Sequence, residues 1–470
     1  MTRTNQMNIY HAICSAIDMA KTLGGKHVVS EIKEIESIDP IRFYHAAEKQ
    51  FCGKRFFWEN QTDGTILIGA GIAASITTER RENYEMIRKN CDDLLKRAHV
   101  MGSCGAEATG PLLVGGFAFE AEKQPSEDWK PFGSGYFFLP AFLLTIQKGC
   151  CYLTRSVVCT SHDDADQLTQ QLVHEEKELF SLLNADFSDL NVLNSLVKQI
   201  DQDIKAWNHL VGEAIRTMGG TELKKVVLAR SRRLKYQHKL SSELLIHALR
   251  TQQDQTCVFC LEKGSSAFVG ATPERLIKKQ GRTIYSACLA GSAARGSTDE
   301  EDASLGKWLL NDRKNRLEHQ YVVSTVRHSL NELCEQLTIP EQPRLMKNKN
   351  IQHLYTPVKG YCNESASLFD FVECLHPTPA LGGFPRAQAL SWISKHEPID
   401  RGYYAAPIGW CDARNNGEFH VGIRSALIHE DEAVLFAGCG VLKDSIPDQE
   451  YKETAIKFRP MLNALSRRHL

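Results

Sequence analysis

Near its C-terminus the sequence reads Gly438-Cys-Gly-Val-Leu-Lys-Asp-Ser-Ile-Pro-Asp-Gln-Glu450-Tyr-Lys-Glu453-Thr-Ala-Ile-Lys457. The apolar run 433–437 directly precedes this stretch and predicts a buried strand. Glycine has no Cβ, so we expect an open Gly-x-Gly turn whose backbone a ligand can approach closely. Pro447 and Asp448 are typical of the first turn of a helix. A strand, a turn and a helix are therefore expected in direct succession.

Three charged side chains are expected on one face of this helix. Glu450, Glu453 and Lys457 are spaced by three and then four residues, which places them on the same side. Two carboxylates and an ammonium beside a glycine turn have the chemistry to hold a divalent cation and an anionic ligand. Taken alone, however, the pattern favours a solvated charged face. The remaining sequence has to distinguish these two interpretations.

Length and composition indicate a globular protein with a large core. The chain has 470 residues, 42% of them hydrophobic, and its 56 basic and 57 acidic residues nearly cancel. This balance gives no reason to expect a nucleic-acid partner, and no charge block indicates a disordered tail. The N-terminus lacks an apolar signal core, and the most apolar run, 137–146, is about half as long as a membrane span. We therefore expect a cytoplasmic protein without a membrane partner.

The cysteines are expected to be reduced thiols in a cytoplasmic protein. There are 15 of them. Cys257 and Cys260 form a single CxxC pair inside a strand-like run, with no second pair at the spacing of a zinc site. We expect most of the cysteines to be small core residues.

The N-terminal part, residues 1–200, mixes helical and strand patterns without a chemical cluster. The runs 56–58 and 65–68 flank Asp63-Gly64, a dipeptide typical of hairpin turns. Two further strands and a polar helix are expected at 111–119, 136–146 and 161–183. No repeat and no Pro/Gly-rich linker separates two halves.

A helix and a strand follow each other from residue 204. Apolar residues at helical spacing predict a helix over 204–218 that ends at Gly219-Gly220. The next apolar segment, Lys225-Val-Val-Leu-Ala-Arg230, predicts a strand with a lysine at its entry. Lys225 is either an edge lysine with its ammonium in water or a partly buried lysine that desolvation turns into a base.

Two carboxylates are expected next to packed structure. Glu274 follows a Gly-Ala-Thr-Pro turn at a strand end, where catalytic groups often lie; a surface glutamate is the alternative. Residues 300–333 predict one long helix. Its expected core stripe is Leu310, Leu317, Tyr321, Val322, Val326, Leu330 and Leu333. Because Glu318 shares a side with this stripe, we expect its carboxylate to need a cation or a metal as a partner.

The C-terminal third is expected to contain two proline-rich loops and two closing strands. Prolines exclude regular structure from 352–357 and 375–383. In the expected strand 418–428, Arg424 alternates with apolar residues and faces the same side as His420. An arginine at this position suits bidentate binding of a carboxylate, with a surface salt bridge as the alternative.

Several stretches together resemble the chorismate-utilising enzymes, a family that includes isochorismate, salicylate, anthranilate and aminodeoxychorismate synthases. Each stretch is weakly specific alone, but the ordered set, which covers about residues 215–465, is highly specific. The stretches are Lys225-Val-Val-Leu-Ala-Arg230, Gly270-Ala-Thr-Pro-Glu274, Leu289-Ala-Gly-Ser292, Glu318-His319, His376-Pro-Thr-Pro-Ala-Leu-Gly-Gly383, Gly409-Trp-Cys-Asp412, Gly422-Ile-Arg424, and Gly438-Cys-Gly440 through Glu453-Thr454 and Lys457. The resemblance implies one large α+β domain, with two stacked sheets flanked by helices. Residues 1–200 would be its variable part and 205–465 its catalytic core.

The resemblance also implies a magnesium site and a binding site for chorismate. Glu318 and Glu453 match the two glutamates that hold one Mg²⁺ in the family, and Glu450 is expected to help through water. Carboxylate oxygens and retained waters are the ligands that Mg²⁺ prefers. The residues implied at the two carboxylates of the substrate and around its ring are Gly291, Ser292, His353, Ala380, Tyr404, Arg424, Gly438, Gly440 and Lys457. A dianionic substrate would thus meet a dication, an arginine and a lysine.

The nucleophile distinguishes the members of the family. Enzymes that add ammonia have a glutamine at the position of Lys225, and aminodeoxychorismate synthases have a nucleophilic lysine where this chain has Ala290. Water is therefore the expected nucleophile. We expect Lys225 to deprotonate water for attack at C2, while Glu274 protonates the departing C4 hydroxyl from the opposite side. Desolvation favours the neutral amine and the protonated carboxyl that these roles require.

The expected product is isochorismate, and menaquinone biosynthesis is the expected pathway. Salicylate synthases, which go on to eliminate pyruvate, usually have a threonine where this chain has Ala380. The run 403–410 is most similar to the menaquinone-pathway isochorismate synthases of bacilli, with the siderophore-pathway isozyme as the alternative. An inactive, regulatory relative is disfavoured because the acid, the base and the charged ligands are all retained. We expect a monomer without a glutaminase subunit.

Overall fold

The computed structural model describes residues 3–78, 83–102, 106–120, 123–184, 194–348 and 351–466. The helices are α1 (Arg3–Leu23), α2 (Pro40–Ala46), α3 (Glu48–Phe51), α4 (Asn83–Leu95), α5 (Ala165–Ser181), α6 (Ile204–Gly220), α7 (Ser242–Gln252), α8 (Asp299–Asn311), α9 (Arg313–Asn331), α10 (Leu368–Leu375), α11 (Arg386–His396) and α12 (Pro447–Ser466). The strands are β1 (His27–Ile35), β2 (Arg55–Asn60), β3 (Thr65–Thr78), β4 (Ala98–Met101), β5 (Leu112–Phe117), β6 (Gly135–Gln147), β7 (Cys150–Cys159), β8 (Leu196–Asp201), β9 (Lys225–Tyr236), β10 (Cys257–Lys263), β11 (Ser266–Thr272), β12 (Arg275–Gln280), β13 (Thr283–Ala294), β14 (Cys334–Thr338), β15 (Arg344–Lys347), β16 (Ile351–Cys362), β17 (Gly383–Phe384), β18 (Pro407–Asp412), β19 (Gly417–Val421), β20 (Ser425–His429) and β21 (Glu432–Leu442).

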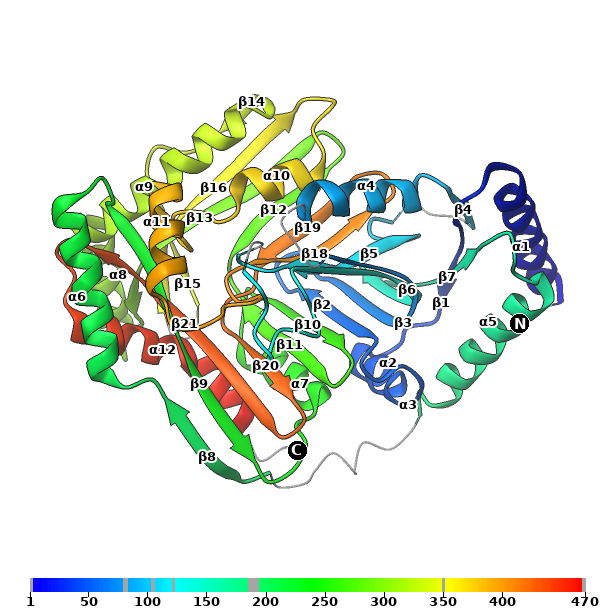
Figure 1. Ribbon diagram of the computed structural model, residues 1–470, viewed down its shortest axis with the longest axis horizontal. Coiled ribbons are helices and arrows are strands. Elements are labelled where there is room, and N and C mark those ends of the chain that lie inside the picture. Colours follow the sequence, from blue (N-terminus) through cyan, green and yellow to red (C-terminus); the bar gives the residue numbers. More distant parts are fainter. Residues whose placement is uncertain are drawn as a thin grey trace.

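The strands form one continuous, largely antiparallel sheet in which the two halves of the chain are interleaved. β1 runs parallel to β4. β2 pairs with β10, and β5 pairs with β18, so strands from residues 1–200 lie beside strands from the C-terminal half. Figure 1 shows α1 and α5 at one end of the molecule and α6, α8, α9, α11 and α12 at the other. This arrangement confirms the expected α+β fold. None of the helices in the described ranges is long and apolar enough to cross a membrane.

Alternate side chains of β21 belong to two different hydrophobic cores, as the two-residue period of a strand requires. Val434 and Phe436 lie in a core that they share with side chains of β2, β5, β6 and β19, between facing layers of strands. Leu435 and Ala437 lie in a second core, which they share with side chains of α1, α7 and α12. The strand is therefore covered on both faces, which explains its continuous apolar run.

Several predicted elements are confirmed closely. The helix expected over 204–218 is α6, which ends at Gly220, and the C-terminal helix α12 begins at Pro447. The expected hairpin is formed by β2 and β3, which pair antiparallel from Asn60 and Thr65 onward. In each case a local signal, such as a glycine pair, a proline or a turn dipeptide, agrees with the final packing.

The expected Gly-x-Gly turn is wrong. Gly438 and Gly440 lie inside β21, where they pair with Ala229 and Val227 of β9. The strand continues to Leu442 because β9 offers a hydrogen-bonding partner along this whole length, and a local glycine signal cannot reveal such a partner. The glycines still leave room beside the backbone, but they do so in the middle of a strand.

The single long helix expected over 300–333 is also wrong. Asp312 separates α8 from α9, and its side chain accepts a hydrogen bond from the Asn315 backbone N–H at 2.9 Å as the N-cap of α9. The break changes the buried face. Leu317 is 41% exposed. The buried residues of α9 are His319, Val322, Val326 and Leu330.

Two predictions about the C-terminal strands need correction. Residues 352–357 are part of β16 rather than a loop; Pro357 is tolerated because it falls between the stretches of β16 that pair with β14 and with β15. The expected strand 418–428 is split into β19 and β20 by residues 422–424, and Arg424 has a positive φ of 53°. Strand alternation therefore does not set the direction of Arg424.

Candidate active site

A cavity of about 90 Å³ brings together side chains from β13, β21, α9, α12 and the segments that connect neighbouring strands. Nearly all residues that the sequence analysis assigned to a site line this cavity. They are Glu274, Gly291, Ser292, Glu318, His353, Ala380, Tyr404, Arg424, Gly438, Gly440, Glu453 and Lys457. Two assigned residues lie just behind the wall: Lys225 contacts Glu318, and Glu450 contacts the wall residue Lys314.

Lys225 is the first residue of β9 and is completely buried. Its Nζ lies 2.7 Å from Oε1 of Glu318. On either side the backbone of Lys225 is paired, with Leu442 of β21 and with Phe384 of β17. The alternative of an edge lysine with its ammonium in water is therefore wrong. This contact with the Glu318 carboxylate holds the Nζ of Lys225 at the cavity wall.

Gly440 provides the space that this pair occupies. A Cβ built on Gly440 would collide with Oε1 of Glu318 and with Cε of Lys225. The requirement for glycine here is therefore steric and comes from two side chains that lie far apart in the sequence. The resemblance had assigned Gly440 to the backbone that receives a carboxylate.

Replacing Gly440 with alanine tests whether the Lys225–Glu318 pair needs this space for activity. We expect Gly440→Ala to lower kcat/KM at least about ten-fold, because displacement of catalytic groups by even about 1 Å is costly. Steady-state kinetics would measure the loss of activity, and thermal unfolding would measure any change in stability. Gly219→Ala is a suitable control, since a Cβ on Gly219 meets no atom within 4 Å. Unchanged kinetics in Gly440→Ala would show that the Lys225–Glu318 pair needs no such space.

Glu274 lies in the short link between β11 and β12 and is buried. Its backbone carbonyl accepts a hydrogen bond from Val421 N–H at 3.0 Å, which fixes the link against β19. Burial raises the pKa of Glu274 to about 7, although Arg424, Lys225 and Lys457 act in the opposite direction. Near neutral pH this carboxyl group therefore holds a proton that it can donate.

Helix α12 presents Glu453 and Lys457 to the cavity as a pair. Lys457 Nζ donates hydrogen bonds to Glu453 Oε1 at 2.6 Å and to the Gly438 carbonyl at 2.8 Å. Burial opposes the charge of both groups, but each stabilises the other, so the pKa of Lys457 is raised and that of Glu453 is lowered. The helix face predicted from spacing thus faces the cavity at these two positions, and the interpretation as a solvated face is wrong there.

Glu450 has a partner that the sequence analysis missed. It is 2% exposed, and its Oε1 accepts a hydrogen bond from Lys314 Nζ at 3.0 Å. Lys314 and its neighbour Asn315 line the cavity from α9, and Asn315 Oδ1 accepts a hydrogen bond from Ser292 N–H at 3.2 Å. Both residues lie one turn before Glu318, so the i, i+3 and i, i+4 spacing was the available signal.

Arg424, Tyr404 and His353 contribute polar groups from other walls. Within the described residues the Arg424 guanidinium forms no ion pair, so it is available for a ligand. Tyr404 is buried and its ring stacks on Phe436 with centroids 5.4 Å apart. His353 Nδ1 and Ser292 Oγ are 2.8 Å apart, and burial lowers the pKa of His353 to about 3, which keeps the imidazole neutral.

A buried ion pair, whose arginine lines the cavity, was also missed. The Arg401 guanidinium donates to both carboxylate oxygens of Glu397 and to the carbonyls of Val227 and Leu381. Glu397 in turn accepts from Ala229 N–H at 2.8 Å. The pair thereby satisfies backbone groups of β9 beyond the point where β17 ends, and it ties the loop that carries Ala380 to this strand.

The carboxylates of the cavity provide only part of the coordination shell that a divalent cation needs. The described part of the chain contains no group of three or more His, Cys, Asp or Glu side chains that could hold a metal ion. Glu318 and Glu453 nevertheless line one cavity. Mg²⁺ commonly uses one or two carboxylates and completes its coordination with waters and substrate oxygens. This donor set therefore fits Mg²⁺ rather than a metal that requires a complete protein cage.

The sequence is similar to known proteins along nearly its whole length. A family model described as chorismate binding enzyme matches residues 15–466. The chain is 37% identical over 474 residues to isochorismate synthase MenF of Bacillus subtilis, covering 99% of each chain. It is 32% identical over 464 residues to the salicylate biosynthesis isochorismate synthase of Pseudomonas aeruginosa, covering 96% of this chain and 93% of the relative.

Solved structures show the same fold. The menaquinone-specific isochorismate synthase MenF of Escherichia coli superposes with a TM-score of 0.78 at 23% identity, covering 97% of this chain and 100% of the other. Anthranilate synthase component I of Streptococcus pneumoniae superposes with a TM-score of 0.67 at 19% identity, covering 84% and 92%.

Proposed function

The chain belongs to the family of chorismate binding enzymes, and from this premise we propose that it is an isochorismate synthase, an isomerase that converts chorismate into isochorismate. One observation carries the proposal: the buried lysine Lys225 lies beside the cavity that is lined by the buried acid Glu274. A protein that only binds an anion has no use for both a base and an acid. The similarity to isochorismate synthases along 99% of the chain supports the same activity.

In the proposed reaction, water replaces a hydroxyl group of the ring. Lys225 removes a proton from water, and the resulting nucleophile attacks C2 while the ring double bonds shift. The C4 hydroxyl leaves with the proton of Glu274 as a second water molecule, so no atoms are gained or lost. A positioned acid and a positioned base each typically contribute about 10²–10⁴-fold to the rate.

The cationic side chains of the cavity suit a substrate with two carboxylates. We assign the ring carboxylate to the end of the cavity formed by Gly291, Ser292 and Lys457. Arg424 and the backbone near Gly438 take the pyruvyl carboxylate, since the guanidinium offers two parallel N–H donors. His353, Ala380, Tyr404 and Gly440 complete the wall around the ring.

One Mg²⁺ ion, held by Glu318 and Glu453 and supported by Glu450 through water, would neutralise the negative charge of the ring carboxylate. We expect Glu453→Gln to weaken Mg²⁺ binding at least about ten-fold, because one of two carboxylate ligands loses its charge. Isothermal titration of Mg²⁺ in the presence of substrate, together with the Mg²⁺ dependence of the rate, would measure this. Asp448→Asn, an exposed acid in the first turn of α12, should leave both unchanged. An unaltered Mg²⁺ affinity of Glu453→Gln would remove Glu453 from the ligand set.

We assign the enzyme to menaquinone biosynthesis, because its most similar full-length relatives include the MenF synthase of Bacillus subtilis. Salicylate synthase activity is less supported, and Ala380 in place of a threonine favours release of isochorismate. We further propose a monomer without a glutaminase subunit. Location in the cytoplasm is supported by the 14 cysteines in the described residues, all of which are free thiols.

Product analysis tests the proposal directly. The protein is incubated with chorismate and Mg²⁺, and the products are separated by chromatography. Isochorismate as the sole new product is the expected result. Salicylate with an equal amount of pyruvate would instead identify a lyase, and anthranilate formed only with ammonium would show that Lys225 does not direct the enzyme towards water.

A further inference from the structure

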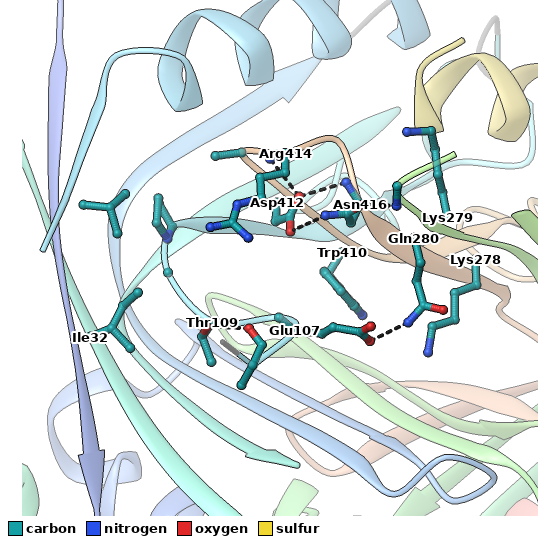
Figure 2. Close-up of a pocket in the computed structure, with 17 residues that line it drawn as sticks. Ile32, Glu107, Thr109, Lys278, Lys279, Gln280, Trp410, Asp412, Arg414 and Asn416 are labelled. Atoms are coloured by element: carbon teal, nitrogen blue, oxygen red, sulfur yellow. Dashed lines mark hydrogen bonds between the residues drawn. The ribbon is translucent and has the colours of Figure 1, made fainter. Parts of the chain in front are cut away.

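Figure 2 shows a second cavity, with a volume of about 300 Å³. It lies at the opposite end of β12 from the active site. β12 begins directly after Glu274 and ends in the wall of this cavity, at the hairpin tip 278–281. The tip of the hairpin between β18 and β19, residues 410–416, and the loop 106–111 form other walls. None of the residues assigned to the active site lines it, and its volume exceeds the 90 Å³ of the active-site cavity.

Trp410 presents an unsatisfied donor at this cavity. The side chain is only 4% exposed, and among the residues that the structure describes its buried Nε1 has no hydrogen-bond partner. Figure 2 shows this end of the indole directed towards Glu107. A buried N–H without an acceptor is costly, so the geometry favours a ligand group that accepts a hydrogen bond here.

Glu107 places an acceptor on the same side. Its carboxylate already accepts a hydrogen bond from Gln280 Nε2, which holds it in position across the cavity (Figure 2). A carboxylate next to the indole N–H disfavours an anionic ligand group at this point. A hydroxyl group fits both neighbours, because its oxygen accepts from Trp410 while its proton is donated to Glu107.

Arg414 supplies a cation at another wall. Figure 2 shows its guanidinium in the cavity, away from Glu107, and within the described ranges it forms no ion pair. The two other cationic residues of the wall already have partners: Lys278 Nζ donates to Asp63 at 2.7 Å, and Lys279 Nζ donates to the Asn415 carbonyl at 3.2 Å. Arg414 is therefore the cation that remains to pair with a carboxylate, which a guanidinium binds in bidentate fashion.

The surface between these polar groups is apolar. Ile32, Val100, Ala108 and Pro111 line it together with the ring of Trp410. A flat hydrocarbon ring suits this surface, whereas a dianionic, polyhydroxylated molecule would leave polar groups without partners. The cavity thus differs in chemistry from the active site, which is lined by several cations.

We propose that this cavity binds a small aromatic carboxylate that carries a hydroxyl group at its far end. The carboxylate pairs with Arg414, the ring lies on the apolar wall, and the hydroxyl bridges Trp410 Nε1 and Glu107.

Isothermal titration with 4-hydroxybenzoate tests the proposal on the full chain. Benzoate, which lacks the hydroxyl, and phenol, which lacks the carboxylate, serve as matched probes. We expect 4-hydroxybenzoate to bind at least about ten-fold more tightly than either of them. Equal affinities for the three probes, or binding that saturating chorismate abolishes, would overturn the proposal.

Two variants locate the binding site. Arg414→Gln, a change at an exposed side chain, should weaken 4-hydroxybenzoate binding about ten-fold and leave phenol binding unchanged. Trp410→Phe should remove the advantage of 4-hydroxybenzoate over benzoate. Lys130→Gln, at a surface lysine that is 71% exposed, is the control and should have no effect. Wild-type affinity for 4-hydroxybenzoate in Arg414→Gln would overturn the proposal even if Trp410→Phe fails to fold.

Discussion

Lys225→Gln should lower kcat for the conversion of chorismate by at least about 10²–10⁴-fold, the range that a positioned general base contributes. Glutamine retains a polar group next to Glu318 and fits the space of the lysine, so the fold should persist. It cannot remove a proton from water. The rate is measured by chromatography of isochorismate, and substrate binding by titration in the presence of Mg²⁺.

The neighbouring lysine provides a matched control for this experiment. Lys224 precedes Lys225 in the chain but is exposed, so Lys224→Gln should retain normal kinetics. Lys225→Ala should be equally inactive but less stable, because it removes the amino group that lies 2.7 Å from the Glu318 carboxylate and leaves a cavity. If Lys225→Gln keeps a near-normal kcat, Lys225 is not the base.

Glu274→Gln should cause a loss of kcat of similar size, about 10²–10⁴-fold, because the amide cannot protonate the departing hydroxyl. The pH dependence identifies the cause. Burial raises the pKa of Glu274 to about 7, so the acid form predominates below this pH. In the wild type kcat/KM should therefore fall as the pH rises through about 7, and this limb should be absent from the residual activity of Glu274→Gln.

The raised pKa of Glu274 also makes the free energy of unfolding depend on pH. The folded state holds the Glu274 proton more tightly than the unfolded state, whose carboxyl titrates near the ordinary value of 4.5. The contribution of this group to the free energy of unfolding is therefore complete below pH 4.5 and is lost as the pH rises through about 7. Glu430→Gln, at an exposed turn residue, is the control. An unchanged limb near pH 7 in Glu274→Gln would assign that limb to another group.

Much of the fold was predictable because local signals and tertiary packing agree. The helix over 204–218, the β2–β3 hairpin and the start of α12 at Pro447 were all marked by residues whose conformational preference is strong. The errors occurred where a distant partner outweighed such a preference. Pro357 lies in a strand because no neighbour needs its N–H, and Gly438 lies in a strand because β9 runs alongside it.

The residue types of the site were available from the sequence, but their partners were not. Spacing placed Glu453 and Lys457 on one helix face, and ordered motifs identified Lys225, Glu274, Glu318 and Arg424. Helical spacing acts within a few residues. The contact of Lys225 with Glu318 joins positions 93 residues apart (318 minus 225), with Gly440 leaving the room for it. Such contacts depend on how strands and helices pack, and no local pattern encodes them.

The C-terminal glycines illustrate this division. The sequence alone established that a buried strand, two glycines and a helix with acidic and basic groups follow one another, because these features depend on composition and spacing. Tertiary structure alone established that Gly440 accommodates the Lys225–Glu318 pair, that Lys457 binds the Gly438 carbonyl, and that Glu450 is neutralised by Lys314. A charge is a property of one residue, whereas its burial and its partner are properties of the folded chain.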